Sequence, residues 1–226
     1  MGINAQYIGK SAAMIKGHSL GTALAATLAA TLVSAPAKAQ GFDYYVLALS
    51  WSPSWCQSQI TRGDAPEQCA PDRDLGFSLH GLWPQYADGG WPENCTTPAS
   101  DPAKGQTAAM ADIMGSAGLA WYQWKKHGRC SELSAEAYFD LSRRAFEAIS
   151  LPDFPAGRRS AAEVEQALLA ANPAFRSDDM VVTCSDGQVR EARICLTPDL
   201  EPRACGQDVL RDACRSTAPL DMPPVP

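Results

Sequence analysis

The stretch GFSLHGLWPQ, residues 76–85, combines a strand pattern with one of the three histidines of the chain. Successive side chains of a strand point to opposite faces, so residues 76–82 predict a short strand. We expect Ser78, His80 and Leu82 on one face of it and Phe77 and Leu79 on the other. Residues 83–101 are rich in Pro, Gly and Asn and predict a loop that carries Trp83, Tyr86 and Trp91.

The sequence on either side of this stretch predicts a mixture of strands and helices. Aromatic and β-branched residues indicate a buried strand at 42–49, and two more strands are expected around the turn 185–187, at 180–184 and 188–196. Apolar residues recur at helical spacing over 106–127, 133–149 and 160–171, whereas 55–73 has the composition of a loop. Because strands and helices do not alternate strictly, we expect an α+β fold.

Length and the first 39 residues define the expected domain organisation. The chain has 226 residues, 46% of them hydrophobic and 19% charged, which suits one globular domain. Residues 1–39 contain lysines but no Asp or Glu, then an apolar run, and end on Ala37-Lys38-Ala39, as a secretory signal does. We therefore expect a signal peptide at 1–39 and a single domain at 40–226 with a flexible Pro-rich tail from about 217. The protein is expected to be secreted or periplasmic and not to enter a membrane.

Charge and cysteine content narrow the class of protein. Without the three lysines of residues 1–39, the chain keeps 16 of its 19 basic side chains against 25 acidic ones, a net charge of −9. This excludes a generally basic polyanion-binding protein, although a local basic patch stays possible. All eight cysteines follow residue 39, and no C-x-x-C motif occurs. An even number of cysteines favours four disulfides in an oxidising compartment over a zinc site.

Only two histidines, His80 and His127, follow residue 39. In WYQWKKHGRC, residues 121–130, helical spacing places four side chains on one face: Tyr122, Gln123, Lys126 and His127. Two imidazoles and a cation are what cleavage of RNA through its 2′-hydroxyl requires. One imidazole removes the 2′-proton, the other protonates the 5′-oxygen, and the cation stabilises the transition state. This chemistry needs neither a metal nor another cofactor, and DNA, which lacks the 2′-hydroxyl, is not expected to be cut.

The segments FSLHGLWPQ at 77–85 and WKKHGRC at 124–130 resemble the two active-site segments of the ribonuclease T2 family, in the same order. FDYYVLALSWSP at 42–53 and the ARICL segment around Cys195 are also similar to that family. The resemblance covers roughly the whole chain after residue 39. It implies a bacterial-type member with an antiparallel-rich central sheet flanked by helices. It also implies a secreted, monomeric endonuclease that cleaves single-stranded RNA through a 2′,3′-cyclic phosphate.

Position by position, the resemblance implies a role for each candidate residue. His80 is the expected general acid, His127 the general base, and Lys126 the cation that stabilises the transition state. Gln123 and Tyr122 stand where the family commonly has Glu and His, which affects rate and pH optimum more than reaction type. Base or substrate contacts are expected from Trp83, Tyr86 and Tyr122. The implied disulfides are Cys56–Cys69, Cys95–Cys130, Cys184–Cys214 and Cys195–Cys205, which sequence alone does not choose among 105 pairings.

Two other classes of protein compete with this interpretation. A binding protein with this fold could have lost turnover through the changes at Tyr122 and Gln123. The retained His80, Lys126 and His127 favour the enzyme, because a binding protein has no need for all three. A metal-dependent hydrolase is the weakest candidate, because two histidines at unrelated spacing make a poor zinc site.

Overall fold

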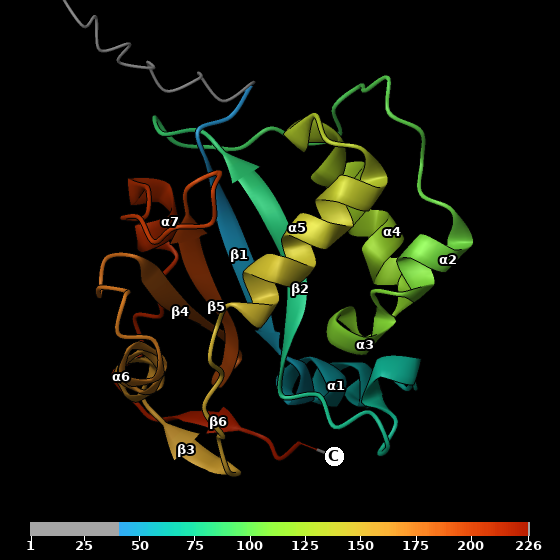
Figure 1. Ribbon diagram of the computed structural model, residues 1–226. Helices are drawn as coiled ribbons and strands as arrows, with labels where there is room; N and C mark the ends of the chain where they lie inside the picture. The colour runs from blue at the N-terminus through green and yellow to red at the C-terminus, as the bar shows by residue number, and fades with distance from the viewer. Residues whose placement is uncertain (1–40, 226) are drawn as a thin grey trace, which may run out of the picture. The chain divides into compact units, whose positions relative to one another are not determined.

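The computed structural model describes residues 41–225, so the expected signal peptide lies outside the described residues. These residues form a six-stranded sheet in the order β2-β1-β5-β6-β3, with β4 paired to β5 (Figure 1). All strand pairs are antiparallel except for a parallel contact between β5 and β6. The strands are β1 (Tyr44–Trp51), β2 (Phe77–Gln85), β3 (Gly157–Arg159), β4 (Met180–Ser185), β5 (Gln188–Leu196) and β6 (Leu220–Met222).

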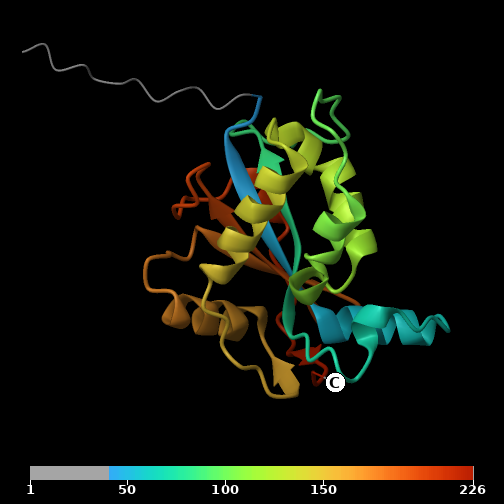
Figure 2. The ribbon, with the colours of Figure 1, turned by 45° about the vertical axis from the view of Figure 1, so that its right-hand side comes forward.

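Helices flank this sheet, which confirms the predicted α+β class. Helix α5 lies across one face of β1 and β2, and α4 stands beside it (Figure 1 and Figure 2). Ser134 and Ser160 cap the N-termini of α5 and α6, because their hydroxyl oxygens accept hydrogen bonds from the backbone N–H groups of Ala137 and Glu163. The helices are α1 (Ser52–Thr61), α2 (Lys104–Ala108), α3 (Ala111–Met114), α4 (Ala117–Lys126), α5 (Ala135–Glu147), α6 (Ala161–Ala171) and α7 (Gln207–Arg211).

The alternation of β1 divides the interior into two clusters. Tyr45, Leu47 and Leu49 point toward α4 and α5 and join the main hydrophobic core, which includes the buried Trp124 of α4. Tyr44 and Val46 point to the opposite face and pack in a smaller cluster with Cys195 of β5. The sheet is therefore buried on both faces at this end.

A β-bulge in β2 changes the predicted face of Leu82. Ala48 pairs with Gly81, but Leu49 pairs with Leu79, so His80 is an extra residue without a partner in β1. The alternation restarts after the bulge, and Leu82 packs in the main core with Phe77 and Leu79. The predicted shared face of Leu82 and His80 is therefore wrong.

Several predicted boundaries also need correction. Strand β2 continues to Gln85, so Trp83 lies on the strand and not on a loop. Helix α1 occupies part of the segment 55–73, which the sequence predicts to be a loop. The predicted helix at 106–127 is three helices, because Gly115 adopts a left-handed φ of 83° that ends α3, and Ser116 caps α4. The expected flexible tail contains β6, which pairs with β3 and buries Leu220 and Met222.

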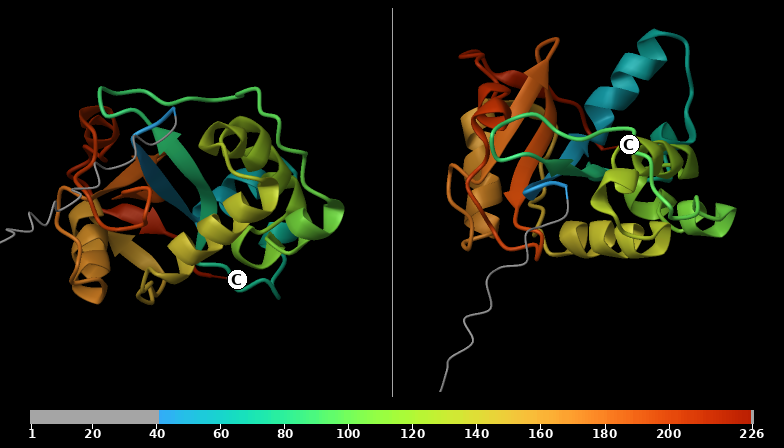
Figure 3. Two further views of the ribbon diagram at one scale, coloured as in Figure 1. Left: turned by 45° about the horizontal axis from the view of Figure 1, so that its top comes forward. Right: turned by 90° about the horizontal axis from the view of Figure 1, so that it is seen from above.

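Four disulfides join the loops to this framework. They are Cys56–Cys69, Cys95–Cys130, Cys184–Cys214 and Cys195–Cys205, the same pairs that the family resemblance implies. Cys95–Cys130 links the long loop after β2 to the turn after α4. Figure 3 shows this loop running along the outside from β2 to α2.

Candidate active site

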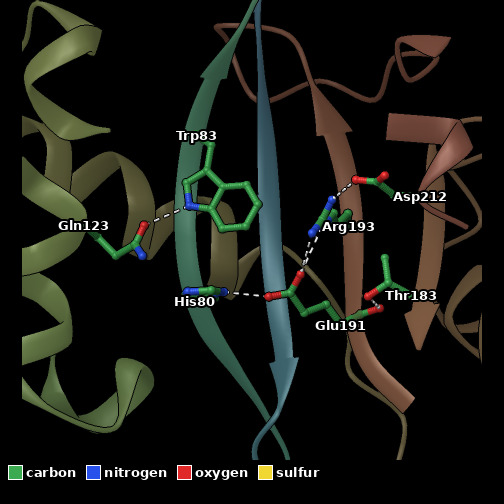
Figure 4. Close-up of polar contacts among 7 residues, drawn as sticks. All are labelled: His80, Trp83, Gln123, Thr183, Glu191, Arg193 and Asp212. Carbon is green, nitrogen blue, oxygen red and sulfur yellow. Dashed lines mark hydrogen bonds and ion pairs between the residues drawn. The ribbon is translucent and has the colours of Figure 1, made fainter. Parts of the chain in front are cut away.

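His80 lies on the bulge of β2 and contacts a buried carboxylate from β5. Its Nδ1 atom is 2.6 Å from Oε1 of Glu191 (Figure 4). The His80 side chain is partly exposed, whereas the Glu191 side chain is almost fully buried. A bulge redirects a side chain without interrupting the strand, which is how His80 leaves the alternation of β2.

Glu191 is ionised despite its burial. Burial alone would raise its pKa, but the hydrogen bond and charge of His80, together with the charges of Arg193 and Arg190, outweigh burial and lower the pKa to about 2. Nε and a terminal nitrogen of Arg193 are each 3.0 Å from Oε2 of Glu191. Arg193 in turn contacts Asp212 at 2.6 Å (Figure 4).

His127 occupies a different environment at the C-terminal end of α4. It is only 4% exposed, and its Nδ1 is among the buried side-chain atoms of residues 41–225 that have no hydrogen-bond partner. Burial, and then the positive charges of Lys126 and His80, lower its pKa from about 6.5 to about 3. His127 is therefore a neutral imidazole at all but strongly acidic pH. Buried polar atoms normally have a partner, so an unpaired ring nitrogen marks a candidate functional site.

Trp83 touches both imidazoles. Its ring centre is 5.2 Å from the centre of His80, edge to face, and 5.2 Å from that of His127, which stacks on it. The indole Nε1 donates a hydrogen bond of 2.8 Å to Oε1 of the buried Gln123 (Figure 4). The Arg193 guanidinium lies 5.4 Å from the ring centre. Trp83 of β2 is thus held by contacts with β5 and α4, and it lies between His80 and His127.

Of the four residues predicted to share one face of α4, two meet at the same partner. Gln123 and His127 both contact Trp83. The Nζ atom of Lys126 lies 3.5 Å from the Oε2 atom of Glu93 on the loop after β2. Tyr122, at 50% exposure, does not take part in this cluster, and Tyr86 is also exposed.

An open cleft of about 810 Å³ lies beside His80 and Glu191. It runs between α1 and the β4–β5 turn, and its lining includes Ser54, Trp55, Arg62, Gln188 and Arg190. Sequence reasoning missed this cleft, and it missed Glu191 and Arg193 in the site. Their one signal in the sequence is that Glu191 and Arg193 alternate with the apolar Ala192 and Ile194 in a strand that is largely buried.

The arrangement suits proton transfer at two points. One imidazole is buried and neutral, and the other is hydrogen-bonded to an ionised carboxylate. Two titratable groups with opposed environments are typical of an acid and a base that work as a pair. Among residues 41–225, no group of three or more His, Cys, Asp or Glu side chains is placed to hold a metal ion. None of the helices in this part of the chain is long and apolar enough to cross a membrane.

Comparison with known proteins gives a consistent family. Residues 42–205 match the model of the ribonuclease T2 family. A ribonuclease of Aeromonas hydrophila is 44% identical over 110 residues, which cover 49% of this chain and 47% of that protein. A protein of Haemophilus influenzae named "Probable ribonuclease" is 37% identical over 121 residues, which cover 49% of this chain and 44% of that protein. The chain thus spans about half the length of these curated relatives.

A solved structure supports the same fold. The structure of an RNase-related protein from Calystegia sepium superposes with a TM-score of 0.67 at 21% identity, covering 83% of this chain and 100% of that chain. At this identity the likeness concerns the fold alone. It agrees with the sheet and flanking helices described above.

Proposed function

Because the chain belongs to the ribonuclease T2 family, we propose that it is an endoribonuclease that cleaves single-stranded RNA without a metal ion. The observation that carries the proposal is the opposed environment of the two imidazoles. His127 is buried, with a pKa of about 3, whereas Nδ1 of His80 contacts the carboxylate of Glu191 at 2.6 Å. The environment of His127 suits a general base, and the environment of His80 suits a general acid.

The proposed reaction is a transphosphorylation. His127 removes the proton from the 2′-hydroxyl, and the 2′-oxygen attacks the phosphorus. The bond from phosphorus to the 5′-oxygen breaks, and His80 donates a proton to that oxygen. The products are a 2′,3′-cyclic phosphate end and a 5′-hydroxyl end. Lys126, next to His127, stabilises the negative charge of the transition state.

The remaining candidate residues receive supporting roles. Gln123 holds the indole of Trp83 through the Nε1 hydrogen bond, and Trp83 positions the substrate beside the two imidazoles. The exposed Tyr86 and Tyr122 offer aromatic faces on which bases can stack. A catalytically weakened RNA-binding protein is not favoured, because both imidazoles and the lysine are retained.

We further propose that the protein is a monomer of bacterial type and that it is exported. The relatives from Aeromonas and Haemophilus support the bacterial type. Four disulfides support export, because such bonds persist in oxidising compartments such as the periplasm or the extracellular space.

The test uses two dinucleotides that differ only at the 2′ position. Purified protein in EDTA should cleave the ribonucleotide, release a 2′,3′-cyclic phosphate and leave the 2′-deoxy analogue intact. His80→Ala and His127→Ala should each lower kcat by roughly 100- to 10,000-fold. Activity that disappears with EDTA, or equal cleavage of the deoxy analogue, would contradict the proposal.

A further inference from the structure

The carboxylate of Glu191 reaches His80 across an intervening strand. Strand β1 lies between β2 and β5, and its Ser50 pairs with Glu191 on one side and Ser78 on the other. The Glu191 carboxylate lies over β1, between the strands that carry His80 and Glu191 (Figure 4). The bulge completes the approach, because it frees His80 from pairing with β1.

The second oxygen of this carboxylate is also held. Arg193 contacts Oε2 of Glu191 at 3.0 Å, and its other terminal nitrogen contacts Asp212 at 2.6 Å. Glu191 is 1% exposed, so water does not compete for these contacts. A buried carboxylate held at both oxygens is rigid, and it therefore restricts the orientation of the imidazole that it contacts.

We propose that Glu191 is the positioning residue of the general acid and fixes the orientation and tautomer of His80. The carboxylate accepts a hydrogen bond from the Nδ1–H, and the second ring nitrogen points away from Glu191 (Figure 4). Nε2 is then the atom that donates a proton to the 5′-oxygen. After this transfer the imidazole remains as the Nδ1–H tautomer, still bonded to Glu191.

This inference rests on the proposed function and adds a residue to it. The family position for a helper carboxylate on the helix is Gln123 in this chain, and Gln123 bonds to Trp83. The carboxylate of Glu191 comes instead from β5, and it serves the acid and not the base. The charged groups that face Glu191 are His80 from β2 and Arg190 and Arg193 from β5.

Glu191→Gln tests the inference, because it removes the charge and keeps a similar shape. Arg193 keeps Asp212 as its partner in this variant. We expect kcat on a ribodinucleotide to fall roughly 10- to 100-fold, less than on loss of the acid itself, with KM within about threefold of wild type. Glu201→Gln makes the same change at an exposed carboxylate outside this chain of contacts, and it should stay within about twofold of wild type.

A second measurement does not depend on the variant. Nitrogen-15 NMR of the wild-type protein should show the neutral imidazole of His80 as the Nδ1–H tautomer. Unchanged kcat in folded Glu191→Gln, or an Nε2–H tautomer in the wild type, would overturn the inference and leave the proposed function intact. A wild-type protein that does not cleave RNA would instead refute the proposed function, and the tautomer would still decide whether Glu191 orients His80.

Discussion

The indole Nε1 of Trp83 donates its hydrogen bond to the side-chain oxygen of Gln123, 40 residues later in the chain. This bond connects the bulged strand that carries His80 to helix α4, which His127 directly follows. His127 stacks on the same indole, so Trp83 contacts both Gln123 and His127. A neutral amide is sufficient for this contact, since only an acceptor oxygen is needed.

Gln123→Met should therefore cost stability as well as activity. The substitution keeps the volume of a side chain that is 1% exposed, but it leaves the indole N–H without its acceptor. We expect a loss of about 1–3 kcal/mol in the free energy of unfolding, measured by urea denaturation. Tyr122→Met, one position earlier on the exposed side of α4, should change it by less than about 0.5 kcal/mol. Equal stability of the two variants would show that the bond contributes little.

Gly81→Ala should disturb the same contact from the strand side. A Cβ atom at residue 81 would lie 2.3 Å from Oε1 of Gln123 and 2.4 Å from Nε1 of Trp83. Both side chains must then move, so we expect a loss of about 1–3 kcal/mol in the free energy of unfolding and a lower kcat. Gly105→Ala in α2 meets no atom within 4 Å and should be neutral or slightly stabilising. A fully active Gly81→Ala enzyme would contradict the importance of this geometry.

The sequence predicts the elements with long, regular patterns and misses those that depend on tertiary contacts. Strand β5 and helix α5 carry clear periodicity and appear where expected. Strands β3 and β6 have three residues each and exist through pairing with one another, which no local pattern reveals. The bulge at His80 is likewise invisible in the sequence, because no local pattern marks an extra residue in the strand.

The same distinction applies to the site. His80 and His127 stand out because few histidines follow residue 39. Glu191 lies 111 residues after His80 and contacts it only because β1 pairs with both β2 and β5. Glu93 resembles an ordinary loop carboxylate in the sequence, and its contact with Lys126 depends on the course of the long loop.

The Cys95–Cys130 disulfide should matter more for activity than its loop length suggests. It closes a separation of 35 residues, and it lies next to the backbone bond from Asn94 N–H to the Lys126 carbonyl at 2.8 Å. Cys95→Ala/Cys130→Ala should lose about 2–4 kcal/mol of stability and should lower kcat in conditions where circular dichroism shows a folded chain. Cys184→Ala/Cys214→Ala is the matched control, because it removes a disulfide that starts on β4 and closes a similar separation of 30 residues. We expect a similar loss of stability there with a smaller loss of kcat, and equal losses of kcat would show that the first link is structural only.

The buried His127 should make the protein less stable as the pH falls. In the folded protein, burial and the charges of Lys126 and His80 lower its pKa to about 3, whereas the value in an unfolded chain is near 6.5. Between these values the unfolded chain binds more protons, so the free energy of unfolding decreases as the pH is lowered from 6.5 toward 3. From pH 6.5 to 5 this contribution amounts to about 1–2 kcal/mol. Glu191, whose pKa falls from 4.5 to about 2 in the folded protein, loses its own stabilising contribution as the pH is lowered from about 4.5 toward 2, below the interval from pH 6.5 to 5. His127→Phe, which cannot be protonated, should therefore show a weaker dependence of urea-unfolding free energy on pH between 5 and 6.5. Parallel pH dependence in the variant and the wild type would mean that His127 is accessible to protons in the folded state, and the assignment of a neutral base at that position would have to be abandoned.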